Sequence, residues 1–234
     1  MITAIIDADS LIYAVGFSSN DVEEQYAISR LEATMVEICM DLDCDDYKGF
    51  LTGKGNFRID LAKTVPYKGT RPAEKPVHLQ ALREHLVSSW GFVIVDGIEA
   101  DDAVGIAAYA VPEDETIMVH IDKDLNQFRG WHYNYRKKDK YYVSEFEGWY
   151  NFYLQILTGD RIDNIEGLKG IGGLLFYLVC ATVNQSHIIK QCVCLFFIEV
   201  CITKQCKHWI LFFYLVVFVF PVSWCYFDIK AITL

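Results

Sequence analysis

Short uninterrupted apolar runs, each followed by acidic residues, are the feature that most constrains this fold. "AIID" at 4–7, "FVIVDG" at 92–97 and "ETIMVHID" at 115–122 are such runs. Helix-like stretches separate them, and one has apolar residues three and four apart: Ile28, Leu31, Met35, Ile38 and Leu42. Strands that are apolar on both faces and alternate with helices are typical of a parallel sheet covered on both sides. The sequence therefore predicts an α/β fold.

Carboxylates follow each predicted strand. In an open parallel sheet, the C-terminal ends of the strands line one crevice. The acids expected there are Asp7, Asp9, Glu99, Asp101, Asp102, Asp122 and Asp124, and "LTGDRIDNIEG" adds Asp160 and Asp163. Each acid taken alone is an ordinary helix cap or surface group. Three groups at one edge instead predict a metal site, because clustered carboxylates repel one another and hard cations such as Mg²⁺ and Mn²⁺ prefer oxygen ligands.

The charge balance bears on binding partners. The chain has 31 acidic and 21 basic residues, a formal net charge of −10. Such a charge argues against a generic polyanion binder, although bound cations would reverse the local field.

The start, "MITAIIDADS", has no basic region typical of a signal peptide, so we expect a cytoplasmic protein with reduced thiols.

A set of motifs occurs in a characteristic order: "IIDADSLIYA", "YKGTRP", "GIEADDAVGIAA", "IDKDLNQ" and "LTGDRIDNIEGLKGIG". Together they resemble the bacteriophage and bacterial 5′–3′ exonucleases of the flap endonuclease superfamily, relatives of the N-terminal nuclease domain of bacterial DNA polymerase I. The resemblance covers residues 1–172. It implies a PIN-like (Rossmann-like) nuclease domain over 1–145, with helices on both faces of the sheet. The start of a helix–three-turn–helix DNA-binding module would follow over 146–172.

The resemblance also implies an activity. Relatives hydrolyse phosphodiester bonds of DNA, or of RNA primers, at 5′ ends or at branch points with a 5′ flap. We expect two Mg²⁺ ions, Mn²⁺ as a substitute, and K⁺ at the helix–three-turn–helix module. The expected partner is DNA bound without regard to sequence, with RNA–DNA hybrids as a further substrate and no obligate protein partner.

Particular residues match the family's site. By position, Asp7, Glu99 and Asp101 resemble ligands of a first ion, and Asp102 a neighbour of both ions. The ligands of a second ion would be Asp122, Asp124, Asp160 and Asp163. Lys68 and Arg71 of "YKGTR" match the basic pair that holds the scissile phosphate, a role that suits their charges. In "GLKGIG", the backbone would bind duplex DNA through Gly167, Lys169, Gly170 and Gly172.

Two stretches depart from the expected pattern or allow two interpretations. The family places an aspartate where "LTGKGNFR" has Thr52 or Gly53, which predicts weaker binding of the first ion. Asp60 lies past this turn and is not assumed to substitute. Lysines and tyrosines alternate over 133–142, and either a strand-contacting surface or an exposed hairpin or loop fits that stretch.

Residues 173–234 differ from the rest of the chain. They contain six of the eight cysteines, no arginine, and only Glu199 and Asp228 as acids. Frameshift or intron read-through is the leading interpretation. A membrane-associated tail through 209–227 and an unfamiliar packed segment are the alternatives. Zinc binding is disfavoured, since the tail has a single C-x₄-C spacing, Cys201 and Cys206, and no second pair to complete a site.

Three other functions compete with a nuclease. The first is a structure-selective DNA-binding remnant that has lost catalysis, and the second is a PIN-type ribonuclease. The extension "GDRIDNIEGLKGIG" argues against the ribonuclease, because a minimal PIN domain has no duplex clamp. The third is a membrane protein built around the tail.

Overall fold

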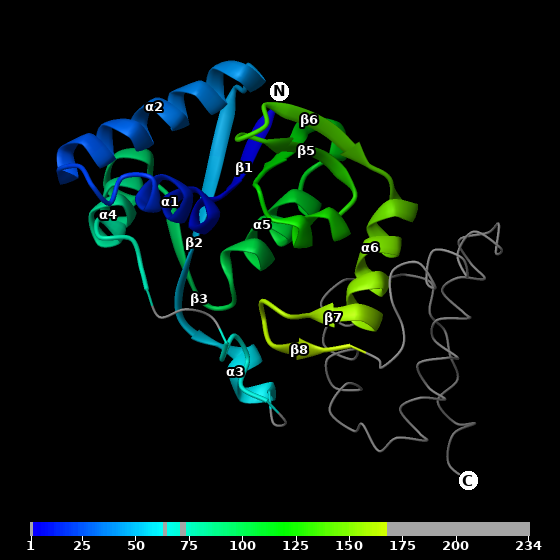
Figure 1. The fold of residues 1–234 in the computed structure, drawn as a ribbon. Coiled ribbons are helices and arrows are strands. Elements are labelled where there is room, and N and C mark those ends of the chain that lie inside the picture. The colour runs from blue at the N-terminus through cyan, green and yellow to red at the C-terminus, as the bar shows by residue number, and fades with distance from the viewer. Residues whose placement is uncertain (1, 63–64, 71–73, 168–234) are drawn as a thin grey trace, which may run out of the picture.

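A six-stranded, mostly parallel sheet forms the centre of the protein (Figure 1). The computed structural model describes residues 2–62, 65–70 and 74–167. The sheet order is β3-β2-β1-β4-β5-β6, and only β6 is antiparallel to its neighbour. Its strands are β1 (Thr3–Asp7), β2 (Asp46–Asn56), β3 (Val93–Gly97), β4 (Thr116–Val119), β5 (Gly130–Asn134) and β6 (Asp139–Val143).

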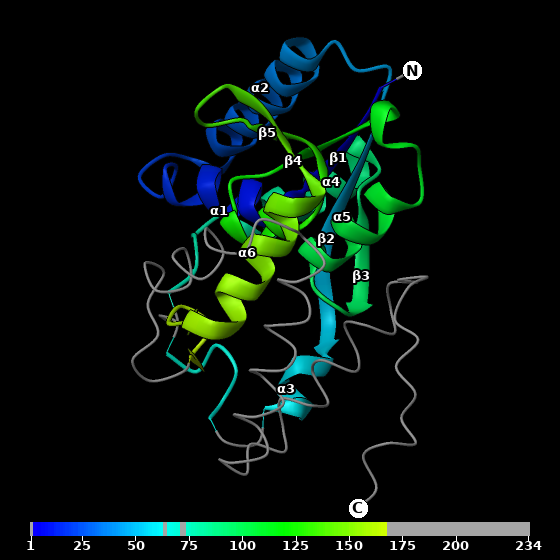
Figure 2. The same cartoon turned by 90° about the vertical axis from the view of Figure 1, so that its right-hand side faces the viewer.

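Helices cover both faces of the sheet. On one face, α1 (Ala8–Phe17), α2 (Glu24–Leu42) and α4 (Leu79–Trp90) pack on Ile6 and Leu51. On the other face, α5 (Ala100–Tyr109) and the short helix η2 (Lys123–Gln127) pack on Ile5 and Met118. Figures 1 and 2 show α1 and α2 on the side of the sheet opposite α5. Neighbouring residues of β1 thus belong to two different cores, which confirms the prediction of strands that are apolar on both faces.

The chain leaves two adjacent strands in opposite directions. β1 pairs with both β2 and β4. After β1 the chain enters α1 on one face, whereas after β4 it enters η2 on the other. In open α/β sheets such a divergence leaves a crevice at the C-terminal edge, where ligands bind. Asp7 and Asp122 lie on its two sides, at the ends of β1 and β4.

Several predicted elements are confirmed, and β3 shows a difference. The predicted helix over 28–42 is the later part of α2. Gly91, with φ 68°, ends α4. "FVIVDG" does form a strand, but it is an edge strand. Val93 and Ile94 are therefore about half exposed, at 52% and 46%, rather than covered on both sides.

The stretch 133–142 is a hairpin of β5 and β6, and two of its tyrosines are buried. Tyr133 and Tyr135 have exposed fractions of 3% and 8% and belong to the core under α2. The idea that these two rings contribute to a strand-contacting surface is therefore wrong, because strand alternation turns both toward the same covered face of the sheet.

The remaining elements flank the sheet or connect its strands. β2 leads into α3 (Phe57–Leu61), and α6 (Glu145–Thr158) is followed by the small hairpin β7 (Gly159–Asp160) and β8 (Ile165–Glu166) (Figure 1). A short helical turn, η1 (Glu113–Glu115), precedes β4. The tail 173–234 and residues 168–172 of the predicted start of the helix–three-turn–helix module lie outside the described residues. Within the described part of the chain, no helix is long and apolar enough to cross a membrane.

Candidate functional site

The first acidic group lies where β1 ends and α1 begins. Asp7 is the N-cap of α1, and its carboxylate accepts a hydrogen bond from Ser10 N at 3.4 Å. The side chain is buried, and burial raises its pKa to about 7, with the nearby charges of Asp9 and Asp122 adding to the shift. Asp122 follows β4, so the electrostatic contact brings together two groups that the sequence places 115 residues apart.

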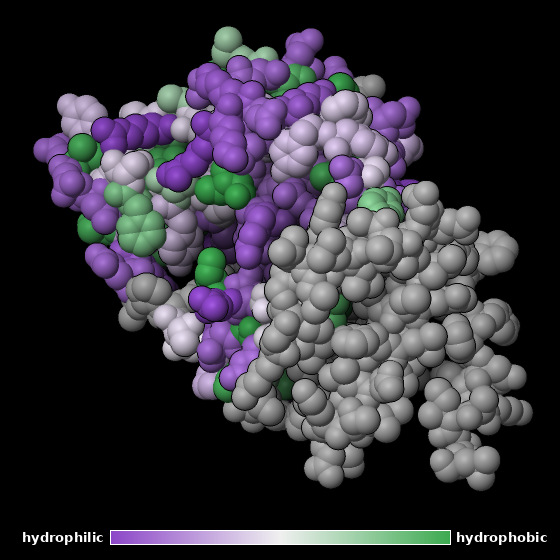
Figure 3. All heavy atoms as spheres, turned by 45° about the vertical axis from the view of Figure 1, so that its right-hand side comes forward, coloured by the Kyte–Doolittle hydropathy of each residue, from purple (hydrophilic) through white to green (hydrophobic). Residues whose placement is uncertain are grey.

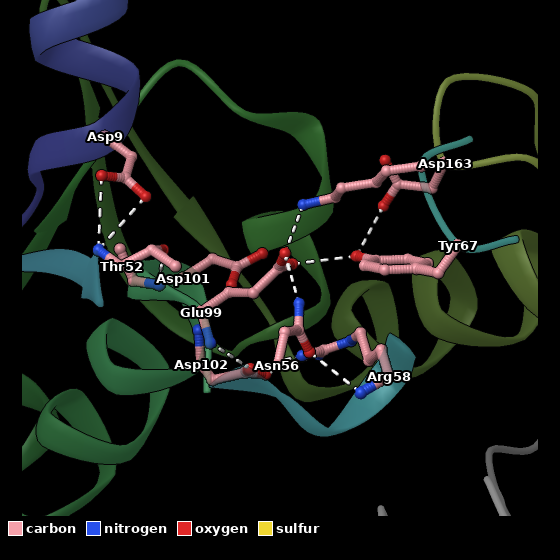
Figure 4. A network of polar contacts seen from close by, with 11 residues as sticks. Asp9, Thr52, Asn56, Arg58, Tyr67, Glu99, Asp101, Asp102 and Asp163 are labelled. Carbon is pink, nitrogen blue, oxygen red and sulfur yellow. Dashed lines mark hydrogen bonds and ion pairs between the residues drawn. The ribbon is translucent and has the colours of Figure 1, made fainter. Parts of the chain in front are cut away.

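Asp9 extends this group toward β2. Both of its carboxylate oxygens lie 3.3 Å from Thr52 N, and Arg83 Nη1 lies 3.8 Å from Oδ1 (Figure 4). Thr52 itself accepts a hydrogen bond from Ala100 N at 2.9 Å. Its hydroxyl therefore fixes the start of α5, while the Asp9 carboxylate lies beside its backbone amide.

The second group is at the start of α5. Glu99 is the N-cap, and the amide N–H of Glu99 donates to Asp102 Oδ2 at 3.1 Å in a capping box. Asp101 is buried, and burial raises its pKa to about 8, reinforced by Asp102, Glu99 and Asp7. The electrostatic contacts of Asp101 thus join the β1 group to the α5 group at one edge of the sheet.

Basic and polar side chains already surround Glu99. Asn56 Nδ2 donates to Oε1 at 2.7 Å, the Lys68 ammonium forms an ion pair with it, and the Tyr67 hydroxyl lies 2.9 Å from Oε2. The same hydroxyl lies 2.9 Å from Asp163 Oδ2 (Figure 4). Tyr67 therefore connects the α5 group to the loop between β7 and β8.

The turn that contains Tyr67 and Lys68 is held against this loop by backbone contacts. Lys68 N donates to Asp163 O at 2.9 Å, and Asn164 Nδ2 donates to Pro66 O at 2.9 Å. The β7–β8 loop thus lies beside the acidic edge even though it follows α6 in sequence. Asp163 reaches the site through this contact.

The third and fourth groups meet near η2. Asp122 caps η2 and accepts from Asp124 N at 2.9 Å. Burial raises the pKa of Asp124 to about 6, with Asp122 and Asp160 adding to the shift. Lys123 Nζ lies 3.1 Å from Asp160 Oδ2. Burial alone would raise the pKa of Asp160, but Lys123 and the amide of Ile162 outweigh it and lower that pKa.

All eight predicted acidic ligands thus belong to one continuous electrostatic network at the C-terminal edge of the sheet. Asp7, Asp101 and Asp122 face one another across the crevice, Asp124 and Asp160 adjoin Asp122, and the Tyr67 hydroxyl joins Glu99 to Asp163. Asp102 differs, because both of its oxygens are held by Arg58. In the described residues, no three of these side chains are close enough to form a ready metal cage.

The donor chemistry of the network fits hard divalent cations. Its potential ligands are carboxylate oxygens, and three of these acids have raised pKa values because their charges are buried near one another.

The Tyr135 hydroxyl near Asp7 is buried and lacks a hydrogen-bond partner in the described part of the protein. Burial, with a contribution from Asp7, raises the pKa of Tyr135, so its phenol keeps its proton.

The described cations near the acids include Lys68, Arg58, Lys123 and Arg83. The structure pairs each with a carboxylate, and the sequence pattern indicated only Lys68. Arg71, Lys169, Gly170 and Gly172 lie outside the described residues. Gly167 is described. A Cβ added there would lie 2.2 Å from the Thr158 carbonyl, so the close backbone contact with the end of α6 requires glycine. Its role toward DNA stays a prediction.

The surface that Figure 3 shows is mostly hydrophilic over the described residues.

Three residues of the site were not predicted from the sequence: Tyr67, Asn56 and Arg58. Tyr67 had a signal, its place beside Lys68 in "YKGTR". Arg58 and Asn56 follow a glycine turn and had no signal in spacing or periodicity.

Comparison with solved structures supports the architecture. The bacteriophage T5 flap endonuclease in a complex with DNA and metal ions aligns with a TM-score of 0.63 and 15% identity, over 80% of this chain and 76% of that one. The T5 5′-exonuclease with bound zinc ions aligns with a TM-score of 0.66 and 16% identity, over 78% and 75%. The predicted PIN-like α/β fold is thereby confirmed. No family model and no curated protein sequence matches the chain.

Proposed function

We propose that this protein is a divalent-metal-dependent nuclease that hydrolyses phosphodiester bonds of DNA at 5′ ends or 5′ flaps, without regard to sequence. RNA–DNA hybrids are a further substrate. The observation that carries the proposal is that acids from four separate segments meet at one sheet edge, and that burial and mutual repulsion raise the pKa values of three of them, Asp7, Asp101 and Asp124. The T5 nucleases that share this fold were crystallised with metal ions, and one of them with DNA.

The network divides into two sets of carboxylates. We assign Asp7, Glu99 and Asp101 to one Mg²⁺, and the second set to another: Asp122, Asp124, Asp160 and Asp163. Mn²⁺ would substitute, because both ions prefer oxygen ligands. When bound, the two metal ions would lower the pKa of a water molecule and stabilise the leaving oxygen of the phosphodiester.

The remaining residues bind the substrate and shape the site. Lys68 pairs with Glu99 in the structure, and its ammonium is free to bind the scissile phosphate once a cation neutralises that glutamate. Asp102 holds Arg58 and thereby fixes the first turn of α5. Asp9, beside Thr52, supplies negative charge at the position of the absent aspartate. Arg71 and the "GLKGIG" backbone would bind the rest of the DNA, and K⁺ would bind at the latter.

A cleavage assay with a matched pair of variants tests the proposal. The full chain is incubated with 5′-labelled flap DNA and Mg²⁺, beside Asp101→Asn and Asp114→Asn, whose side chain is exposed on η1 away from the site. We expect short 5′ products from the wild type and from Asp114→Asn, and at least a 100-fold slower reaction from Asp101→Asn. EDTA should abolish cleavage.

Equal cleavage by Asp101→Asn would contradict the assignment. A mobility shift of flap DNA with no products at millimolar Mn²⁺ would instead favour the catalytically inactive DNA-binding remnant. A matched RNA strand, cleaved faster than the DNA strand, would favour a PIN-type ribonuclease.

A further inference from the structure

Tyr135 is a buried tyrosine whose hydroxyl group has no assigned role. It directly follows β5, and only 8% of its surface is exposed. Among the described residues, its hydroxyl is the buried side-chain polar atom without a hydrogen-bond partner. Buried tyrosine hydroxyls ordinarily find a partner, and an exception calls for an explanation.

The neighbouring tyrosines of the hairpin show the ordinary situation. Tyr133, two residues earlier on the same face, donates to Asp41 Oδ2 at 2.6 Å. Tyr141, on β6, donates to Asn126 Oδ1 at 2.7 Å. The hydroxyls of Tyr133 and Tyr141 thus connect the hairpin to neighbouring elements by hydrogen bonds. The hydroxyl of Tyr135 makes no such connection within the described residues.

The groups that face Tyr135 belong to the acidic edge. The pKa of Tyr135 is affected by Ser10 as a hydrogen-bonding neighbour, and by the charges of Asp7 and Arg136. The Ser10 hydroxyl already donates to Asp7 O at 3.0 Å. The carboxylate of Asp7 accepts a single hydrogen bond within the described part, from Ser10 N at the long distance of 3.4 Å. An ionised carboxylate has about four lone-pair sites, so Asp7 lacks donors while Tyr135 lacks an acceptor.

We propose that Tyr135 is a positioning residue, whose hydroxyl donates to the carboxylate of Asp7 when that carboxylate holds a divalent cation. The inference rests on the proposed function, because it gives Asp7 the role of a ligand. A hydrogen bond to the oxygen that does not bind the ion fixes the orientation of the carboxylate, and such outer partners strongly affect metal affinity. The aromatic ring, packed under α2, holds the hydroxyl in place.

The test uses Tyr135→Phe and, as a matched control, Tyr133→Phe in the full chain. Mn²⁺ binding is measured by isothermal titration calorimetry without DNA, and thermal unfolding is measured in EDTA. We expect Tyr135→Phe to weaken Mn²⁺ binding about 10-fold and to leave the metal-free melting temperature unchanged or raised, because the hydroxyl it removes is unpaired. Tyr133→Phe should lower the melting temperature, because it removes a made hydrogen bond, and should leave Mn²⁺ affinity unchanged.

Other results would overturn the inference in distinguishable ways. If the wild type binds Mn²⁺ and Tyr135→Phe binds it equally well, the role of Tyr135 is wrong while the proposed function stands. If Tyr135→Phe lowers the melting temperature as Tyr133→Phe does, its role is merely structural. If the wild type does not bind Mn²⁺ at all, the proposed function fails, and the assignment of Tyr135 fails with it.

Discussion

Arg58 and Asp102 form a two-pronged ion pair. Nη1 lies 2.6 Å from Oδ2, and Nη2 lies 2.7 Å from Oδ1 (Figure 4). Because Asp102 also accepts the amide N–H of Glu99, the pair joins α3 to the first turn of α5. The orientation of Glu99 and Asp101, which extend from this turn, therefore depends on an arginine outside the acidic motif.

Removing this arginine should destabilise the protein, most of all without metal. Arg58→Ala leaves Asp102 unpaired beside Asp101, and we expect the free energy of unfolding in EDTA to fall by about 1–3 kcal/mol. Arg58→Lys should recover only part of the loss, since an ammonium cannot make the paired contact. Urea unfolding of the three proteins checks this, and equal stability of Arg58→Ala and the wild type would contradict it.

Asp101→Asn should have opposite effects with and without metal. In EDTA the variant should be more stable than the wild type, because it removes a buried charge that Asp102, Glu99 and Asp7 repel. With Mg²⁺ at about 100 times its dissociation constant, only the wild type should gain about 2.7 kcal/mol. Melting curves at both conditions check this. An equal Mg²⁺ gain in the variant would exclude Asp101 as a ligand.

The metal-free protein should become more stable as pH falls from 8 to 6.5. The folded pKa values of Asp7 and Asp101, about 7 and about 8, lie above the ordinary value of 3.8. The folded state therefore binds more protons than the unfolded chain in this window, and stability is lost as pH rises. Melting temperatures in EDTA should show this trend. Saturating Mg²⁺ should flatten it, because bound ions keep the carboxylates ionised.

A buried histidine pair should act in the opposite direction below pH 6.5. His120 Nε2 lies 2.7 Å from His132 Nδ1, and burial lowers the two pKa values to about 3 and about 4. The unfolded chain is protonated first as pH falls from 6.5, so stability is lost by at most about 1.4 kcal/mol per pH unit for each histidine. Asp7 and Asp101 still stabilise the folded state in this range, so the histidines should flatten the rise in stability below pH 6.5. Urea unfolding in EDTA from pH 8 to 4.5 measures this, and a rise that is as steep below pH 6.5 as above it would contradict the effect of the histidines.

Close packing of α5 should make Gly105 sensitive to substitution. A Cβ there would lie 2.4 Å from the Phe128 ring, so Gly105→Ala must push α5 away from the segment after η2. We expect a loss of about 1–3 kcal/mol in unfolding free energy, as for other overpacked cores. Gly55→Ala is the control for added bulk, because nothing lies within 4 Å of its Cβ position, although its φ of 70° adds local strain. Equal losses in the two variants would show that packing on Phe128 is unimportant.

The sequence predicted the sheet and the gathering of acids, because both follow from local patterns. Strands that are apolar on both faces require a covered sheet, and parallel strands bring their C-terminal ends to one edge. Asp7, Glu99 and Asp122 were therefore foreseeable. The exposure of Val93 was not, since strand order decides which strand lies at the edge.

The partners of the acids were less predictable, because they depend on contacts between distant segments. Arg58 and Asp102 are 44 residues apart, and Tyr67 and Asp163 are 96 apart. The periodicity of apolar residues along the sequence does not indicate which distant polar residues will contact each other. Tyr135 was taken for part of a possible surface because composition shows that tyrosines and lysines alternate but does not show which face of a hairpin is covered.

The pairing of acids with Arg58, Lys68 and Lys123 has a consequence for how the molecule matures. Small zinc domains stay unfolded until their ion arrives. Under the proposed function, these protein cations would take the ion's place during folding, so the polypeptide would fold first and bind the ion afterwards. Binding of the ion would then be an exchange of counterions that frees the side chains of Lys68 and Lys123 for a negatively charged strand.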